Sequence, residues 1–341
     1  MITAAKNIYH REHFYRITAL WVICEAFAGG IMHGFKVPFS GMMVSSLAVF
    51  CIVLLAKYVP SKTAILKATV IVAIFKLMLS PHSPPTAYVA VFFQGLVGQL
   101  LFLQRKFFTG SAIALAVLAL VESAVQRILV LMILYGNEFW KAVDDFIRKV
   151  TGSKSIDNYS LAIAIGYIIL HAIVGIFVGY FSARMVRNSE HWSHQFPQYL
   201  IEDDSHLNDA MITRSKSKKK KIRWVFLLAW ILLLAFYLQS VLDPAGALLP
   251  KDKVLQILIR SALIIVAWYL FISPLIMLAI RKALLAKQAK NKSEINVTMQ
   301  LLPEMKMIFK KCWQLSDEQK GYARLKLFLK ILLMNVLKVP A

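Results

Sequence analysis

Residues 109–135 read TGSAIALAVLALVESAVQRILVLMILY, a long apolar run that only a few polar side chains interrupt. A helix needs about 20 apolar residues to cross the roughly 30 Å of hydrocarbon in a bilayer. Lipid accepts only helices and closed barrels, because backbone polar groups find no water there, and this run is far too long for a barrel strand. The stretch therefore predicts a membrane-spanning helix whose surplus length makes it tilt or project from the bilayer.

Further apolar runs lie on both sides of this one. Of the 341 residues, 58% are hydrophobic and 17% are charged, whereas a soluble domain has about 25% charged residues. Residues 1–15 contain charges and no apolar core, so we do not expect a cleaved signal peptide. The sequence predicts an all-α polytopic membrane protein with eight transmembrane helices. They are expected at 16–35, 38–57, 63–80, 85–103, 109–135, 160–183, 224–242 and 255–280.

The formal net charge of +22 is explained by topology. Lys and Arg collect on the cytoplasmic loops of membrane proteins. With the N-terminus inside, the inner loops hold most of these residues, including the run RSKSKKKKIR at 214–223, whereas residues 81–86 outside hold no Lys, Arg, Asp or Glu. Both termini are therefore predicted to be cytoplasmic. Membrane lipids, and not nucleic acids, are the expected partners of the basic segments.

Composition divides the chain into four parts. Residues 1–184 form a predicted six-helix transmembrane bundle, and the polar residues 185–223 form a cytoplasmic basic linker. Residues 224–281 form a two-helix transmembrane hairpin, and residues 282–341 form a cytoplasmic tail. Within the tail, apolar residues recur at helical spacing with lysines between them at 299–313 and 322–339, separated by QLSDEQKG at 314–321. This pattern is typical of amphipathic helices that lie on a membrane surface or in the groove of a partner.

Polar side chains inside the first six spans indicate a binding site. A charge at mid-bilayer costs roughly 2.5–3.5 kcal/mol on insertion scales, so each one requires an explanation. Most of these residues fall between mid-membrane and the outer surface, which favours an outward-opening polar cavity. The alternative is a set of separate structural contacts, in which Glu122 pairs with Arg127 and Glu25 meets a hydroxyl or backbone group. The predicted substrate-binding residues are Glu25, His33, Lys76, His82, Gln94, Glu122, Arg127 and His171.

The connector SPHSPP at 80–85 is predicted to face outward, beside Lys76. Its prolines restrict how far the connector bends. A stiff outer hairpin that holds Lys76 and His82 fits the rim of the cavity. The alternative is a short connector that is rich in proline for no functional reason. The mixed charge of the candidate residues suits a small polar or zwitterionic solute.

Metal binding is an alternative that the sequence leaves open, because His33, His82, His171 and Glu25 are all potential ligands. No two of them have the i,i+4 spacing of a helical metal site, and the three cysteines form no C-x-x-C motif. The chain also lacks a P-loop, an H-E-x-x-H and a G-x-S-x-G motif. We therefore expect no metal, no cofactor and no catalytic activity, with an intramembrane enzyme built on Glu and His as a further alternative.

Small residues predict where helices approach each other closely. The run GIFVG at 175–179, the run AFAGG at 26–30 and the alanine-rich stretch that begins at Ser111 all have this character. Small side chains let the backbones of membrane helices come together. Packing inside the bundle is the interpretation that we favour over contact with a partner.

The predicted six-span unit, with its outer loops HGFKVPFSG at 33–41 and SPHSPP at 80–85, resembles the S component of energy-coupling factor (ECF) transporters. The resemblance covers residues 1–184. It implies a bacterial cytoplasmic (inner) membrane protein that binds a vitamin, a precursor or a metal ion from outside and docks to a T component with two ABC-type ATPase subunits. The tail faintly resembles the coupling helices of a T component. It departs from them because YARL at 322–325 lacks the glycine of the family's Ala-Arg-Gly signature, and only two spans precede it.

The resemblance implies a membrane transport component that takes up a small water-soluble nutrient, driven by separate ATPase subunits. A second hypothesis is a membrane scaffold, which recruits a cytoplasmic or anionic-lipid partner through the basic run 214–223 and the tail.

Overall fold

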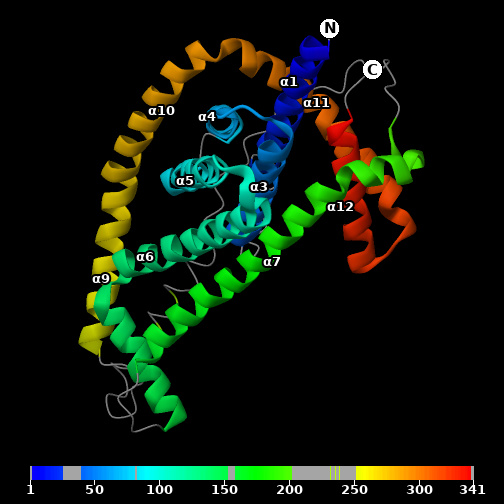
Figure 1. Cartoon of the computed structure of the whole chain (residues 1–341). Helices are drawn as coiled ribbons and strands as arrows, with labels where there is room; N and C mark the ends of the chain where they lie inside the picture. The colour runs from blue at the N-terminus through cyan, green and yellow to red at the C-terminus, as the bar shows by residue number, and fades with distance from the viewer. Residues whose placement is uncertain are drawn as a thin grey trace. The chain divides into compact units, whose positions relative to one another are not determined.

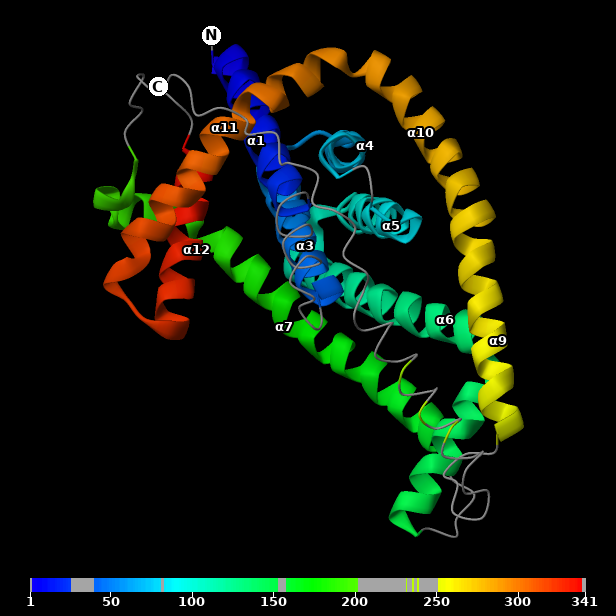
Figure 2. The ribbon, with the colours of Figure 1, turned by 180° about the vertical axis from the view of Figure 1, so that it is seen from behind.

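The computed structural model describes residues 2–25, 40–80, 83–152, 158–201 and 251–338, together with the single positions 231, 235 and 238. Every regular element within these ranges is helical, and none is a strand (Figures 1 and 2). The prediction of an all-α protein is therefore confirmed. The helices are α1 Ile2–Ile23, α3 Ser40–Tyr58, α4 Ala64–Leu79, α5 Pro85–Leu101, α6 Phe108–Thr151, α7 Tyr159–Gln195, α9 Lys251–Ala267, α10 Ser273–Lys290, α11 Lys292–Leu315 and α12 Gly321–Leu337.

Four helical segments within the described ranges are long and apolar enough to cross a membrane. They are Ser40–Tyr58, Phe108–Thr151, Tyr159–Gln195 and Val254–Lys290, and Pro85–Leu101 is apolar but shorter. The chain is thus a helical membrane protein. The arrangement of six spans plus two, eight in all, stays a prediction, because most of 224–242 and the end of 16–35 lie outside the described residues.

Two helices continue beyond the ends that the apolar pattern predicts. The helix α6 runs to Thr151, so much of the expected outer loop 136–159 is helical. It contains one break, at Gly136, where φ is 70° and glycine alone avoids strain. The helix α7 runs to Gln195, so the first part of the expected linker 185–223 is also helical. Both extensions are too polar to be recognised by hydropathy.

The chain divides into two compact units, and the division cuts across the expected boundaries. The first unit contains 1–123, 171–208 and 277–341, and the second contains 124–170 and 209–276. The first spans and the C-terminal tail therefore belong to one unit, whereas the sequence placed them in separate parts.

In the first unit, α4 and α5 form an antiparallel hairpin with close backbone contact. A Cβ added to Gly95 would collide with the side chain of Thr69, so no larger residue fits without movement. At the other end of the hairpin, the side-chain amide of Gln99 donates a hydrogen bond to the main-chain oxygen of Lys62. The pairing of residue 95 with residue 69 fixes the register. Seven residues further toward the connector, Lys76 is therefore level with Tyr88.

The glycines of α7 pack directly on the backbone of α6. A Cβ added to Gly175 would lie 2.7 Å from the Cα of Val117, and one added to Gly179 would collide with the Cα of Ile113. The buried Ala112 and Ala116 of α6 lie at the same contact. The prediction that GIFVG and the alanine-rich stretch pack inside the bundle is confirmed, whereas the run 26–30 lies outside the described residues.

The two amphipathic helices of the tail are present as α11 and α12, and they pack beside α1 (Figures 1 and 2). Their apolar side chains, including Met305, Ile308 and Ile331, join the main hydrophobic core of the first unit. Along the second half of α12, the residues from 331 to 336 are all buried. The apolar faces of the tail thus contact the chain's own first helix.

The second unit has a small core of its own, built from Tyr135, Ala142, Val254, Ile257 and Leu258. The carboxylate of Asp144 accepts hydrogen bonds from the main-chain N–H and the hydroxyl of Ser160, at 2.7 and 3.0 Å. The N–H groups in the first turn of a helix have no intrahelical partner. Asp144 therefore satisfies one of them and ties α7 to the second half of α6.

Candidate functional site

The structure brings two of the predicted residues into direct contact. The ammonium of Lys76 on α4 lies 2.6 Å from the carboxylate of Glu25, which directly follows α1. Their side chains are only 8% and 3% exposed. The sequence had offered a hydroxyl or a backbone group as the structural partner of Glu25. Its described partner is instead a second charge from a different helix.

The depth of this pair follows from the helices that carry it. The ammonium of Lys67, nine residues (76 − 67) before Lys76 on α4, lies over the ring of Phe14 on α1 and is half exposed. Nine residues of helix rise about 13.5 Å. If Lys67 marks the inner interface, as the topology predicts, the pair lies near the middle of a hydrocarbon layer roughly 30 Å thick.

Several buried polar atoms in the first unit have no hydrogen-bond partner among the described residues. Three of them, on α1 and α5, are the indole N–H of Trp21, the hydroxyl of Tyr88 and the amide oxygen of Gln94. Trp21 precedes Glu25 by one helical turn, and Tyr88 is level with Lys76 in the α4–α5 hairpin. A buried polar group without a partner costs about 1–3 kcal/mol. Such groups in a native structure require an explanation, and one explanation is a ligand that supplies the hydrogen-bond partner when it binds.

The amide nitrogen of Gln94, unlike its amide oxygen, has a hydrogen-bond partner. It donates a 3.0 Å hydrogen bond to the hydroxyl of Ser45 on α3, and both residues are buried. With this hydrogen bond made, the amide oxygen has no partner among the described residues. Gln94 and Tyr88 are both buried residues of α5.

The remaining predicted residues do not all join this pair. His171 on α7 is buried, and the register of Gly175 against Val117 places it level with Val121, next to Glu122. Glu122 is partly exposed on α6, and Arg127 is exposed and belongs to the second unit. His33 and His82 lie outside the described residues.

Both members of the pair are buried among the described residues. Residues 26–39 and 81–82, which follow Glu25 and Lys76 in the sequence, lie outside them. Nor do three His, Cys, Asp or Glu side chains gather as metal ligands anywhere in the described ranges. Cys24 and Cys51 are buried free thiols, and their side chains contact each other beside Glu25.

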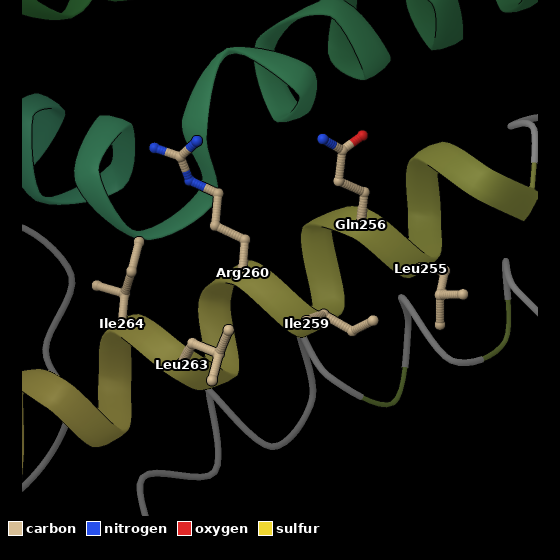
Figure 3. Close-up of a pocket in the computed structure, with 6 residues that line it drawn as sticks. All are labelled: Leu255, Gln256, Ile259, Arg260, Leu263 and Ile264. Atoms are coloured by element: carbon tan, nitrogen blue, oxygen red, sulfur yellow. The ribbon is translucent and has the colours of Figure 1, made fainter.

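One charged residue inside a predicted span was missed. Arg260 lies within the expected span 255–280, where a cation in an apolar run was the available signal. Its guanidinium packs on the backbone of α6 at Gly136. Figure 3 shows Arg260 and Gln256 extending from α9 toward α6. The neighbouring Leu255, Ile259, Leu263 and Ile264 complete a hollow of about 570 Å³ in the second unit.

A second missed residue is Arg16, which the sequence assigned to the inner end of the first span. Its guanidinium lies 2.9 Å from the carboxylate of Glu304 on α11. It also donates to the main-chain oxygens of Asn335 and Val336 on α12, at 3.1 and 3.0 Å. The carbonyls in the last turn of a helix have no intrahelical partner, so a cation there is favourable. No sequence spacing signals a contact between residues so far apart.

Comparisons of this chain with protein-family models, with curated proteins and with solved structures find no match.

Proposed function

We propose that the chain is a membrane transport component, which binds a small water-soluble nutrient such as a vitamin or a precursor within the membrane for uptake. The observation that carries this proposal is the buried ion pair between Glu25 and Lys76. Removing two charges from water costs more than a simple packing role would justify, and replacing such pairs by apolar residues often leaves stability unchanged. Ionisable residues inside membrane segments are a functional-site hypothesis by default.

The proposed architecture is that of an S component of an ECF-type transporter in a bacterial cytoplasmic membrane. In this proposal the chain has eight spans with both termini inside, and Glu25 and Lys76 lie near mid-membrane in a site of the first six helices that opens outward. The chain lacks a P-loop, so the energy comes from separate ABC-type ATPase subunits. A T component joins them in this family.

Within this site, Glu25 and Lys76 hold the charged ends of the solute. Gln94 offers its amide oxygen, and Tyr88 offers a ring for stacking together with a hydroxyl group. His33 and His82 belong to the outer rim. Glu122 and His171 line the α6–α7 side in this proposal, whereas Arg127 lies in the second unit and stays a prediction from the sequence.

The packing of the tail favours transport over the scaffold hypothesis. A free docking arm keeps an apolar face available for its partner. Here the apolar faces of α11 and α12 pack in the chain's own core, beside α1. The tail is thus better suited to complete the first unit, and any coupling to ATPase subunits uses its exposed polar side.

Uptake of a panel of labelled vitamins into bacterial cells tests the proposal. Cells that carry the chain should accumulate one of them, and the variants Glu25→Gln and Lys76→Met should lose this uptake. The variant Lys67→Met is the matched control, because it removes a lysine of the same helix whose ion pair with Glu294 is partly exposed. Uptake that survives both site substitutions would reject the site. Uptake equal to that of cells without the chain, with no ATPase co-purifying, would reject the transport function.

A further inference from the structure

We propose that the solute of this site is a net-neutral zwitterion. Its carboxylate takes the place of Glu25 beside Lys76, and its protonated nitrogen takes the place of Lys76 beside Glu25. This assignment rests on the proposed transport function and names the chemical class of the solute.

The charge balance of the buried pair carries the assignment. Glu25 and Lys76 together have no net charge, and both are almost completely shielded from solvent. A singly charged solute adds one uncompensated charge to this buried region, which is strongly unfavourable. An uncharged solute cannot replace either member of the pair. A zwitterion replaces the ion pair between Glu25 and Lys76 by two ion pairs, one with each residue, and the total charge of the buried region stays at zero.

In this proposal, three buried polar atoms that have no hydrogen-bond partner among the described residues bind the body of the solute. Trp21 supplies a donor one turn from Glu25, and Gln94 supplies the amide oxygen that its hydrogen bond to Ser45 leaves without a partner. Tyr88, level with Lys76, supplies a hydroxyl that both donates and accepts. None of the three atoms has a partner among the described residues. A solute with polar groups between its charged ends gives each of them one.

The pair also explains how the empty site stays neutral and closed. At 2.6 Å each charge satisfies the other, so neither is left alone in the core without solute. The solute must separate Glu25 from Lys76, and its binding is favourable only if it pairs with both of the separated charges. This requirement discriminates against singly charged competitors, because a site whose own charges stay unpaired rejects them.

The experiment uses the full-length protein in phospholipid nanodiscs and an isotope-labelled bacterial metabolite extract as the probe. After equilibration at neutral pH and removal of free compounds, mass spectrometry identifies the labelled molecules that the protein retains. The same measurement is made with Glu25→Gln, Lys76→Met and the double variant Glu25→Gln/Lys76→Met. The double variant has no unpaired buried charge, so it is expected to fold even if a single variant does not. Lys67→Met is the matched control.

The expected result is retention of a compound with one anionic group and one protonated nitrogen. Retention should fall at least about tenfold in the double variant, which corresponds to about 1.4 kcal/mol of binding free energy, and should be unchanged in Lys67→Met. A retained compound with a net charge, or with no charged group, overturns the assignment and leaves the transport function standing. A retained zwitterion that the double variant binds equally well also overturns it. If no compound is retained at all, both the assignment and the proposed function fail.

Discussion

Arg16 on α1 donates a hydrogen bond to the main-chain oxygen of Asn335 on α12, across 319 residues of sequence. The same guanidinium donates to Val336 and pairs with Glu304. One buried cation thus holds the first helix against both helices of the tail. This contact makes the tail a structural part of the unit that contains Glu25 and Lys76.

Replacing Arg16 by methionine should destabilise the first unit. Hydrogen bonds to a charged group contribute about 1.5–3 kcal/mol, and Arg16→Met removes the two that Arg16 donates to α12. Glu304 keeps a side chain that is 32% exposed, so solvent compensates part of its lost pair. We expect a loss of about 2 kcal/mol in the free energy of unfolding. Thermal unfolding in detergent measures it, with Lys141→Met, which removes an exposed pair with Glu138, as the near-neutral control. Equal effects of the two variants would contradict the buried role of Arg16.

The ion pair between Glu25 and Lys76 should give a large coupling energy. Removing one partner leaves the other charged and buried, so Lys76→Met alone should cost about 3–5 kcal/mol. Adding Glu25→Gln should recover most of that loss, because the remaining charge is then also removed. A double-mutant cycle on unfolding free energies measures the coupling. Additive effects of the two substitutions would show that the side chains do not interact.

Gly179 and Gly166 are on the same helix and should respond oppositely to alanine. A Cβ on Gly179 meets the backbone of α6, which cannot rotate away, so Gly179→Ala should cost about 1–3 kcal/mol. A Cβ on Gly166 meets nothing within 4 Å. Gly166→Ala should therefore stabilise the helix by about 0.5–1 kcal/mol. The unfolding temperatures of the two variants provide the comparison, and a shift of the same sign in both would count against this α6–α7 contact.

Asn335 should control the order of residues 199–201. Its amide nitrogen donates to the main-chain oxygen of Tyr199, and its amide oxygen accepts from the N–H of Ile201, at 2.9 and 2.8 Å. Asn335→Leu leaves these main-chain groups without partners, at a cost of about 1–3 kcal/mol. We expect faster hydrogen exchange at Ile201. The exposed Asn291→Leu, whose side chain binds only the carbonyl of Lys287 in the described hydrogen bonds, should leave that exchange unchanged.

His13, which precedes the predicted first span, should make stability depend on pH. Burial lowers the pKa of His13 to about 4, and the charges of His10 and Arg16 act in the same direction. The unfolded chain takes up this proton near its ordinary pKa of about 6.5. Stability is therefore complete above about pH 6.5 and is lost as the pH falls toward about 4. Unfolding temperatures measured between these limits should fall more steeply for the native chain than for His13→Gln. Parallel curves would exclude His13 as the source.

The sequence predicts those features that depend on local composition. Apolar length predicts α3, α6 and α7, and small residues predict the contact of Gly175 and Gly179 with α6. The extension of α6 to Thr151 was missed because its last part is polar and Gly136 absorbs the break. An amphipathic pattern in the tail has the same spacing whether the apolar face meets lipid, a partner or the chain's own core. Only the structure shows that it meets α1.

For the candidate site, the sequence marks unusual residues but does not predict which of them contact each other. A charge inside an apolar run marks Glu25 and Lys76 as unusual, because each needs compensation in lipid. Their pairing depends on the relative depth and rotation of α1 and α4, which periodicity does not determine. Arg16 was missed for the same reason. It lies at the inner end of the predicted first span, and its contacts lie at the far end of the chain.

The clamp at Arg16 also has a consequence for biosynthesis. The ribosome completes Val336 only 320 residues after Arg16. At about 5–20 residues per second this interval lasts on the order of tens of seconds. Throughout it the first helix lacks the carbonyls that will compensate its cation. A nascent chain that stops before α12 therefore keeps a cation on α1 without the main-chain oxygens that satisfy it in the complete molecule.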